Sequence, residues 1–253
     1  MRVKVWPSRG ERIIWRIARI VRFILFYLNL YSNDWQDRGS KEALGYLKNK
    51  DLVSSQFWYG FVKSYNVLSV LEIGSNCGPR VINLAQKYPD ISFIGLDLNK
   101  PAIDLGNSFA RVKQIRNLKF VCHNLLSNNY SEILGISDQS VDLVLSWATL
   151  IYIKPKDIIN VIQNILNIQP RLVLLLEVEP RRKIRNAHLG RVAPLEPFYV
   201  RNYFQTMYRA TKALGIEVKQ ISEEIVPLEI WNPGGGVPMV RLFELTYTSS
   251  LRS

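Results

Sequence analysis

The sequence has few residues of the kinds that build disulfide frameworks and metal centres. Only two cysteines and two histidines occur among its 253 residues. Cys77 and Cys122 lack the spacing of a metal site, and two cysteines are too few for a disulfide scaffold. We therefore expect no bound metal and a reducing compartment, the cytoplasm.

Acidic residues are also in short supply. The chain has 33 Lys and Arg against 21 Asp and Glu, a net charge of +12. Such a balance favours an anionic partner: a membrane surface, a nucleic acid or a phosphorylated substrate. Residues 1–31 contain seven basic residues and one acid, which is half of the whole excess. We therefore treat residues 1–31 as a separate region.

This first region lacks an apolar run long enough to span a membrane. Its uninterrupted apolar stretch, Phe23–Leu28, is far shorter than the roughly 20 residues that a bilayer requires. Basic residues are threaded through the apolar ones, which argues against a secretory signal peptide. Four arginines spaced by three or four residues share one helical face: Arg12, Arg16, Arg19 and Arg22. The pattern of residues 11–31 therefore predicts a basic amphipathic helix that lies on an anionic membrane surface. The alternative is a helix that packs on the protein and keeps its arginines in water.

Beyond a helical connecting region, residues 32–64, the chain alternates between apolar runs and helical patterns over residues 65–253. Runs of Val, Ile and Leu are typical of parallel strands buried on both faces. We expect a doubly wound, Rossmann-like α/β fold with a seven-stranded, mostly parallel sheet. The expected strands are 67–73, 92–98, 118–123, 141–146, 171–178, 217–221 and 241–248, and the expected helices are 80–87, 100–112, 156–166 and 201–214.

The turn after the first strand, "EIGSNCGPR", narrows the choice of ligand. A dinucleotide-binding turn requires G-x-G-x-x-G, but counting from Gly74 the second and third glycines fall on Asn76 and Pro79. A phosphate-binding loop of the Walker A type is excluded as well, because no Gly-Lys-Ser/Thr follows.

The same turn resembles the first motif of class I S-adenosylmethionine-dependent methyltransferases, an acid followed by x-Gly-x-Gly-x-Gly. Asn76 replaces the middle glycine, and asparagine is the side chain that best tolerates a left-handed backbone. The matching residues are Glu72, Gly74, Ser75, Asn76, Cys77 and Gly78.

The resemblance implies S-adenosylmethionine as the cofactor and assigns roles to several side chains. Glu72 would serve the ammonium group through water, and Asp97, which ends the second strand, would accept hydrogen bonds from both ribose hydroxyls. Leu98 would pack on the adenine, and the Asn124 carbonyl oxygen would accept from the adenine amino group.

The segment "SWATLIYI" follows the fourth strand and places Ser146 and Trp147 at the mouth of this site. Trp147 would cover the sulfonium by a cation–π contact, or else pack in the core. For the catalytic base we consider His188, Glu177 and Glu179, which end or follow the fifth strand. Single acids at strand ends are often structural, so this choice stays open.

The motifs also resemble a bacterial subgroup of these enzymes linked to sugar and surface-polysaccharide modification. That resemblance implies methylation of a hydroxyl on a glycan or a lipid-linked sugar, at the inner face of a membrane. The absent Asn-Pro-Pro-Tyr signature argues against a nucleic acid as partner. Two alternatives stay open: a phospholipid N-methyltransferase that acts on a lipid acceptor, and a non-catalytic methyltransferase-like scaffold subunit.

Overall fold

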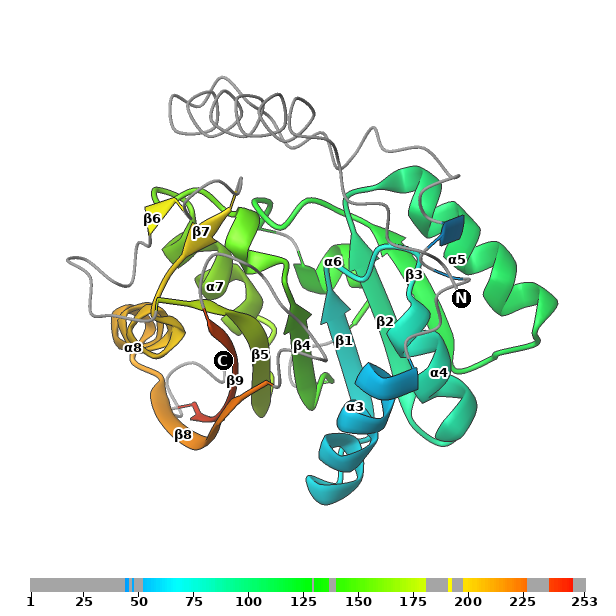
Figure 1. Cartoon of the computed structure of the whole chain (residues 1–253), viewed down its shortest axis with the longest axis horizontal. Helices are drawn as coiled ribbons and strands as arrows, with labels where there is room; N and C mark the ends of the chain where they lie inside the picture. Colours follow the sequence, from blue (N-terminus) through cyan, green and yellow to red (C-terminus); the bar gives the residue numbers. More distant parts are fainter. Residues whose placement is uncertain are drawn as a thin grey trace, which may run out of the picture.

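A seven-stranded sheet with helices on both faces forms most of the described part of the chain, which also contains a two-stranded sheet (Figure 1). The computed structural model describes residues 44–45, 47, 52–128, 130–136, 140–180, 191–192, 198–226 and 237–247. The sheet has seven strands in the order β3-β2-β1-β4-β5-β9-β8. They are β1 (Ser69–Ile73), β2 (Ser92–Asp97), β3 (Leu118–Cys122), β4 (Leu143–Trp147), β5 (Leu172–Glu179), β8 (Glu217–Ile225) and β9 (Val237–Thr246).

Strands β1 to β5 are parallel, and β9 runs antiparallel between β5 and β8. The predicted fold class, a doubly wound and mostly parallel sheet of seven strands, is therefore confirmed. The chain builds β1, β2 and β3 outward in one direction and then returns to place β4 on the other side of β1. Ligands of such sheets bind where the order reverses, at the carboxyl ends of the strands. In this protein that place is at the carboxyl ends of the neighbouring strands β1 and β4.

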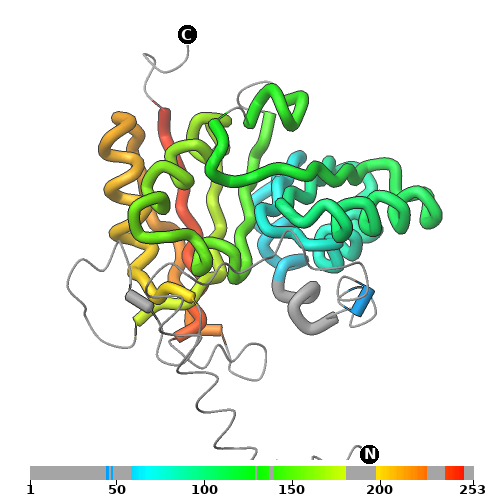
Figure 2. Tube along the Cα trace, turned by 90° about the horizontal axis from the view of Figure 1, so that it is seen from above, coloured from blue at the N-terminus to red at the C-terminus, as the bar shows by residue number. Residues whose placement is uncertain are grey.

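In the described part of the chain, three helices pack against each face of the sheet. Alternate strand residues point to opposite faces, so neighbours such as Val70 and Leu71 belong to different hydrophobic cores. One core contains side chains of α3 (Leu52–Ser64), α4 (Pro79–Lys87) and α5 (Lys100–Val112). The other contains side chains of α6 (Tyr130–Leu134), α7 (Ile158–Leu166) and α8 (Tyr203–Leu214). In Figure 2 the segments from α3 to α5 lie at one side of the molecule, and α8 with β9 at the other.

The predicted strands and helices match the structure to within about two residues up to α8, and then the boundaries diverge. β8 continues four residues beyond the expected end, through a register shift between Gln220 and Ser222. β9 begins at Val237, four residues earlier than expected. Four short elements were not predicted: α6, the 3₁₀ turn η2 (Leu150–Tyr152), and the strand pair β6 (Arg191–Val192) and β7 (Tyr199–Val200).

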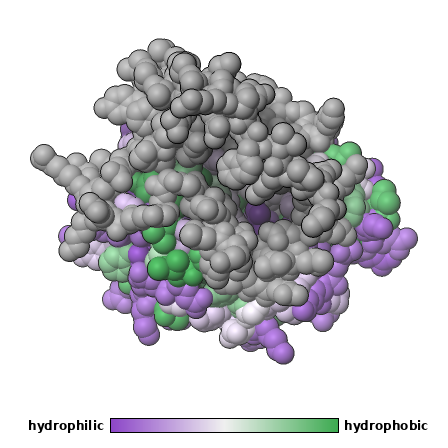
Figure 3. Space-filling model, viewed as in Figure 1, coloured by the Kyte–Doolittle hydropathy of each residue, from purple (hydrophilic) through white to green (hydrophobic). Residues whose placement is uncertain are grey.

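The predicted amphipathic helix, residues 11–31, lies outside the described residues, as does most of the connecting region 32–64 before α3. Within the described ranges, no helix is both long and apolar enough to cross a bilayer. On the face shown in Figure 3, hydrophilic residues cover much of the described surface and apolar ones form small separate patches.

Candidate functional site

The turn after β1 occupies the point where the strand order reverses. Its backbone is left-handed at Gly74 (φ 68°), Asn76 (φ 53°) and Gly78 (φ 75°). The Asn76 side chain stabilises this conformation, because its Oδ1 accepts a hydrogen bond from the Cys77 backbone N–H at 2.7 Å. Asparagine therefore adopts at this position the left-handed backbone that the middle glycine of the motif would also allow.

The two glycines of this turn are also required by close packing. A Cβ on Gly74 would overlap the side chain of Thr149, and a Cβ on Gly78 would overlap the ring of Phe120. Thr149 approaches because its Oγ1 donates to the Ile73 carbonyl oxygen at 3.3 Å. The loop after β4 and the turn after β1 thus lie in direct contact.

Asp97 joins the end of β2 to this turn. Its Oδ2 accepts from the Asn76 backbone N–H and its Oδ1 from the Asn99 backbone N–H, both at 2.8 Å. Burial raises the pKa of Asp97, and the hydrogen bonds from Asn99 and Asn76 oppose that rise. Each carboxylate oxygen keeps a free acceptor site for a ligand hydroxyl. Leu98 is 36% exposed and places an uncovered apolar side chain beside it.

Glu72 is buried beneath the turn and pairs with Arg80, a residue that the sequence reasoning did not single out. Its Oε1 accepts from Arg80 Nε at 2.6 Å, and the side chain is 2% exposed. Burial raises the pKa of Glu72, while Arg80 and the Val81 backbone N–H lower it. Its Oε2 is buried and has no hydrogen-bond partner in the described part of the chain. A buried carboxylate oxygen in this state fits a cationic group of a ligand.

Arg80 also contacts the residue that ends β4. Its guanidinium carbon lies 5.0 Å from the centroid of the Trp147 ring, and that ring lies 5.6 Å from the ring of Trp58 on α3. Trp147 therefore has a cation of the protein itself over its ring, whereas the predicted contact was with the sulfonium of the cofactor.

Ser146 and Glu177 meet each other inside the protein and hold the loop after β4. The Ser146 hydroxyl donates to Glu177 Oε1. The same carboxylate accepts backbone N–H groups of Thr149 at 3.2 Å, Leu150 at 3.1 Å and Ile151 at 3.2 Å. Ser146 is 0% and Glu177 1% exposed, and both are engaged by these hydrogen bonds. In this structure both side chains support the loop after β4, while their roles as cofactor contact and base stay predictions.

Arg201 completes this support from the other side of the loop. It is fully buried and donates from Nη1 to the Leu150 carbonyl oxygen and from Nη2 to that of Ile153, each at 2.6 Å. The sequence carried no signal for this role, because Arg201 precedes α8 and meets the loop only in the folded chain. The loop that carries Trp147 and Thr149 is thus fixed by two buried charged residues.

Glu179, the second predicted base, is also engaged in the core. Arg241 of β9 donates to both of its oxygens, with Nη2 2.9 Å from Oε2. The Tyr203 backbone N–H donates to Oε1 at 3.0 Å. The pair therefore ties β5, β9 and α8 together. His188, the remaining candidate, lies outside the described residues.

The other predicted cofactor residues make mainly local contacts. Asn124 is exposed, and its Oδ1 accepts the Leu126 backbone N–H at 3.0 Å, so the oxygen expected to read the adenine amino group stabilises its own turn. Ser75 and Cys77 are fully buried, and burial raises the pKa of the Cys77 thiol to about 12. Cys77 takes part in the turn through its backbone N–H, and the Ser75 hydroxyl donates to the Asn76 carbonyl oxygen at 3.4 Å. In the described ranges, no cluster of side chains has the composition of a metal site.

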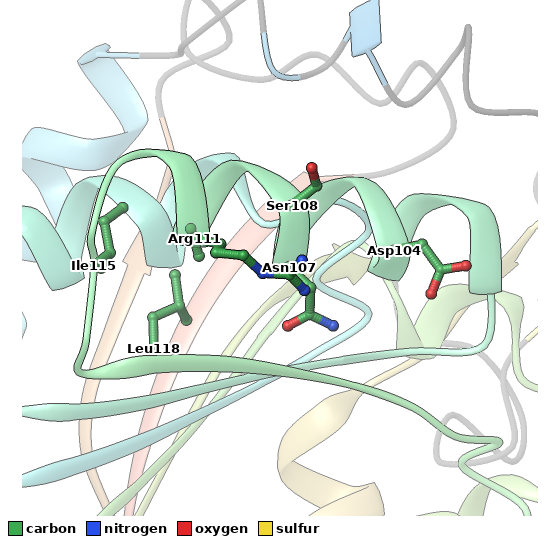
Figure 4. A pocket seen from close by; sticks show the side chains of 7 residues that line it. Asp104, Asn107, Ser108, Arg111, Ile115 and Leu118 are labelled. Atoms are coloured by element: carbon green, nitrogen blue, oxygen red, sulfur yellow. The ribbon is translucent and has the colours of Figure 1, made fainter.

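An open hollow of about 520 Å³ lies away from this turn, along α5 (Figure 4). Its polar lining includes Asn107, whose side chain donates to the Phe120 carbonyl oxygen and accepts the Phe120 N–H, both at 3.2 Å. None of the predicted cofactor residues lines it. We therefore place the candidate site at the carboxyl ends of β1, β2 and β4, where the glycine turn, Asp97, Glu72 and Trp147 meet.

Comparisons with known proteins bear on the segment that contains this candidate site. Residues 70–169 match the family model described as "Methyltransferase domain". The tRNA (guanine-N(7)-)-methyltransferase of Mannheimia succiniciproducens is 24% identical over 108 residues, 43% of this chain and 39% of that protein. The enzyme of the same name from Prochlorococcus marinus is 42% identical over 55 residues, 22% of this chain and 26% of that one. The chain thus spans less than half of these curated relatives.

Solved structures share the fold at low sequence identity. A SAM-dependent methyltransferase from Methanosarcina mazei aligns with a TM-score of 0.53 and 18% identity, over 73% of this chain and 96% of that one. The N-terminal domain of EvdMO1 with SAH bound aligns with a TM-score of 0.51 and 12% identity, over 76% and 81%. Residues 70–169 thus match a methyltransferase domain model, and the seven-stranded sheet shares its fold with these solved structures.

Proposed function

We propose that this protein is an S-adenosylmethionine-dependent methyltransferase. The observation that carries the proposal is the Asp97 carboxylate, which links the end of β2 to the left-handed turn after β1 through the Asn76 N–H. It lies inside the segment that matches the methyltransferase domain model, residues 70–169. Both of its oxygens keep acceptor capacity for the ribose hydroxyls of the cofactor.

Each part of the site has a distinct task in this proposal. S-adenosylmethionine, when bound, supplies an electrophilic methyl group on a sulfonium. Asp97 holds the ribose, Leu98 packs on the adenine, and the turn from Gly74 to Gly78 allows close approach of the backbone. The loop after β4, fixed by Glu177 and Arg201, keeps Trp147 in place at the mouth. Alignment of the reacting groups by such a rigid site contributes several kcal/mol, on the order of 7–11 at most, to lowering the barrier.

For the acceptor we propose a hydroxyl of a glycan or lipid-linked sugar at the inner face of a membrane. The support is chemical: the net charge of +12, the basic amphipathic pattern of residues 11–31, and five basic residues between 181 and 191 that suit a phosphate or carboxylate. His188 is our candidate for the base that takes the hydroxyl proton. The second candidate acceptor is an RNA base, because relatives such as the Mannheimia enzyme are named tRNA (guanine-N(7)-)-methyltransferases.

Calorimetric titration with S-adenosylmethionine and S-adenosylhomocysteine tests the cofactor. We expect micromolar binding by the full chain and a loss of at least tenfold in Asp97→Ala. Asp104→Ala is the matched control, because Asp104 is an exposed acid of α5 paired with Lys100. Absence of binding to either compound would contradict the proposed function, and unchanged affinity in Asp97→Ala would remove the ribose assignment.

Transfer of a labelled methyl group then separates the acceptors. We expect label in lipid-linked glycans when the protein is incubated with bacterial membranes. Label in phosphatidylethanolamine vesicles would favour the phospholipid N-methyltransferase instead. Label in tRNA, with an affinity that falls steeply as salt rises, would favour the RNA base. Cofactor binding without transfer to any of them would support the scaffold alternative.

A further inference from the structure

Arg201 is a buried cation that bridges segments far apart in the sequence. It directly follows β7, and its backbone N–H donates to the Val178 carbonyl oxygen of β5 at 3.4 Å. Its guanidinium donates to the carbonyl oxygens of Leu150 and Ile153, at the two ends of η2. Arg201 is 0% exposed, and a buried guanidinium that loses its acceptors is strongly destabilising. We therefore expect β7 and the loop after β4 to move as one unit.

An apolar contact joins the same segments. Phe198 and Val200, at the second strand of the β6–β7 pair, share a small hydrophobic core with Ile151 of η2 and Val178 of β5. All four side chains are buried. This core is separate from the two that cover the faces of the sheet. The β6–β7 pair therefore packs on the loop after β4, at the carboxyl end of β5.

Thr149 connects this loop to the glycine turn. Its Oγ1 donates to the Ile73 carbonyl oxygen at 3.3 Å, and its backbone N–H donates to Glu177 Oε1 at 3.2 Å. Its side chain fills the space in which a Cβ on Gly74 would lie. Because packed contacts of this kind transmit displacements, a shift of the loop changes the surroundings of the turn.

We infer that ligand binding at the glycine turn is coupled to the position of the β6–β7 pair, with Arg201 as the positioning residue that links them. The coupling rests on the proposed function, which supplies the ligand of the turn. β6 begins at Arg191, the last of the five basic residues proposed to bind an anionic group of the acceptor. Because coupling between two sites is reciprocal, an acceptor that orders the β6–β7 pair would tighten cofactor binding by the same factor.

Hydrogen–deuterium exchange, followed by mass spectrometry with and without S-adenosylhomocysteine, tests the coupling on the full chain. Opening of the β6–β7 pair requires Arg201 to release the loop, so a ligand bound at the turn should slow exchange in both places. At a ligand concentration of about 100 Kd, an opening that releases the ligand slows by about 100-fold. We expect protection of residues 74–78, and slowing by about fivefold or more at residues 198–200.

Two variants interrupt the path at different points. Arg201→Met removes the hydrogen bonds to the loop carbonyls but keeps a long side chain in the core. Thr149→Val removes the Oγ1 hydrogen bond with little change of shape. Each variant should retain ligand protection of residues 74–78 and lose most of it at residues 198–200. Arg209→Met is the matched control, because Arg209 is exposed on α8, and it should behave like the wild type.

The outcomes separate the coupling from the proposed function. Protection of the turn without protection of residues 198–200 in the wild type would overturn the coupling and leave the proposed function standing. Protection of residues 198–200 that persists in both variants would overturn the path through Arg201. An equal loss at both places in Arg201→Met would mean that Arg201 only supports the fold. If Arg201→Met does not fold, Thr149→Val decides by the same criterion. Failure of the wild type to bind S-adenosylhomocysteine would overturn the proposed function as well.

Discussion

The buried carboxylate of Glu177 makes the stability of this protein dependent on pH in a specific sense. Burial raises its pKa to about 7 from an ordinary 4.5, although hydrogen bonds from Ser146, Leu150, Thr149 and Ile151 oppose the rise. At pH values between 4.5 and about 7, Glu177 is therefore protonated to a greater extent in the folded state than in the unfolded state. The free energy of unfolding therefore falls as the pH rises from about 4.5 to about 7, and stays lowered above it.

The size of this effect follows from the two pKa values. One pKa unit corresponds to about 1.4 kcal/mol, so a rise from 4.5 to about 7 amounts to about 3 kcal/mol. Glu177→Gln removes the titration. Its amide group meets the same donors less well, a cost of about 1–3 kcal/mol that is equal at every pH. The difference in unfolding free energy between wild type and variant should therefore move by about 3 kcal/mol in favour of Glu177→Gln between pH 4.5 and 7.

Urea unfolding followed by tryptophan fluorescence at several pH values between 4.5 and 8 measures this difference. Glu224→Gln is the control, because Glu224 is exposed on β8 and the substitution removes the same charge without the burial. A difference that does not vary with pH would refute the reasoning. A difference that moves the opposite way would mean that the hydrogen bonds outweigh burial and that Glu177 is ionised throughout.

Two further predictions concern the glycine turn and the first segment of the chain. Gly74→Ala should lower the free energy of unfolding in urea by at least about 2 kcal/mol, because of its φ of 68° and the overlap with Thr149. Adding Thr149→Gly should recover part of that loss, and no recovery would contradict the contact. Deletion of residues 1–31 should abolish sedimentation with anionic vesicles and leave binding of S-adenosylhomocysteine unchanged. If the intact chain does not sediment, the membrane prediction is wrong.

The elements that the sequence predicted well are those whose pattern is local. Strands of five to eight residues in near-continuous Val, Ile and Leu mark the parallel part of the sheet, and β1, β2 and β5 begin and end within two residues of expectation. β9 was shortened because Pro238 looked like part of a loop, whereas in the structure it pairs with Val178. β8 was shortened because its second half is largely polar and is mostly exposed on the last strand of the sheet.

The residues of the candidate site also fall into two groups, those that a local sequence motif predicts and those that depend on tertiary contacts. Asp97 and the turn from Gly74 to Gly78 could be predicted, because the motif places them along a single βαβ unit. The contact of Glu177 with the loop after β4 was missed, because a strand-end acid looks the same in sequence whether a loop folds over it or not. Arg80 was missed since its importance depends on Glu72 and Trp147, which reach it only through tertiary contacts.

The two edges of the sheet avoid adding further strands by different means. Exposed strand edges present unpaired N–H and C=O groups and invite association between molecules. At the β3 edge, the Asn107 side chain satisfies both backbone groups of Phe120, in the way that a neighbouring strand would. β8, at the other edge, carries the exposed charged residues Glu217, Glu223 and Glu224. A side-chain amide on a helix thus satisfies backbone groups at one edge, and exposed charged side chains disfavour the pairing of a further strand at the other.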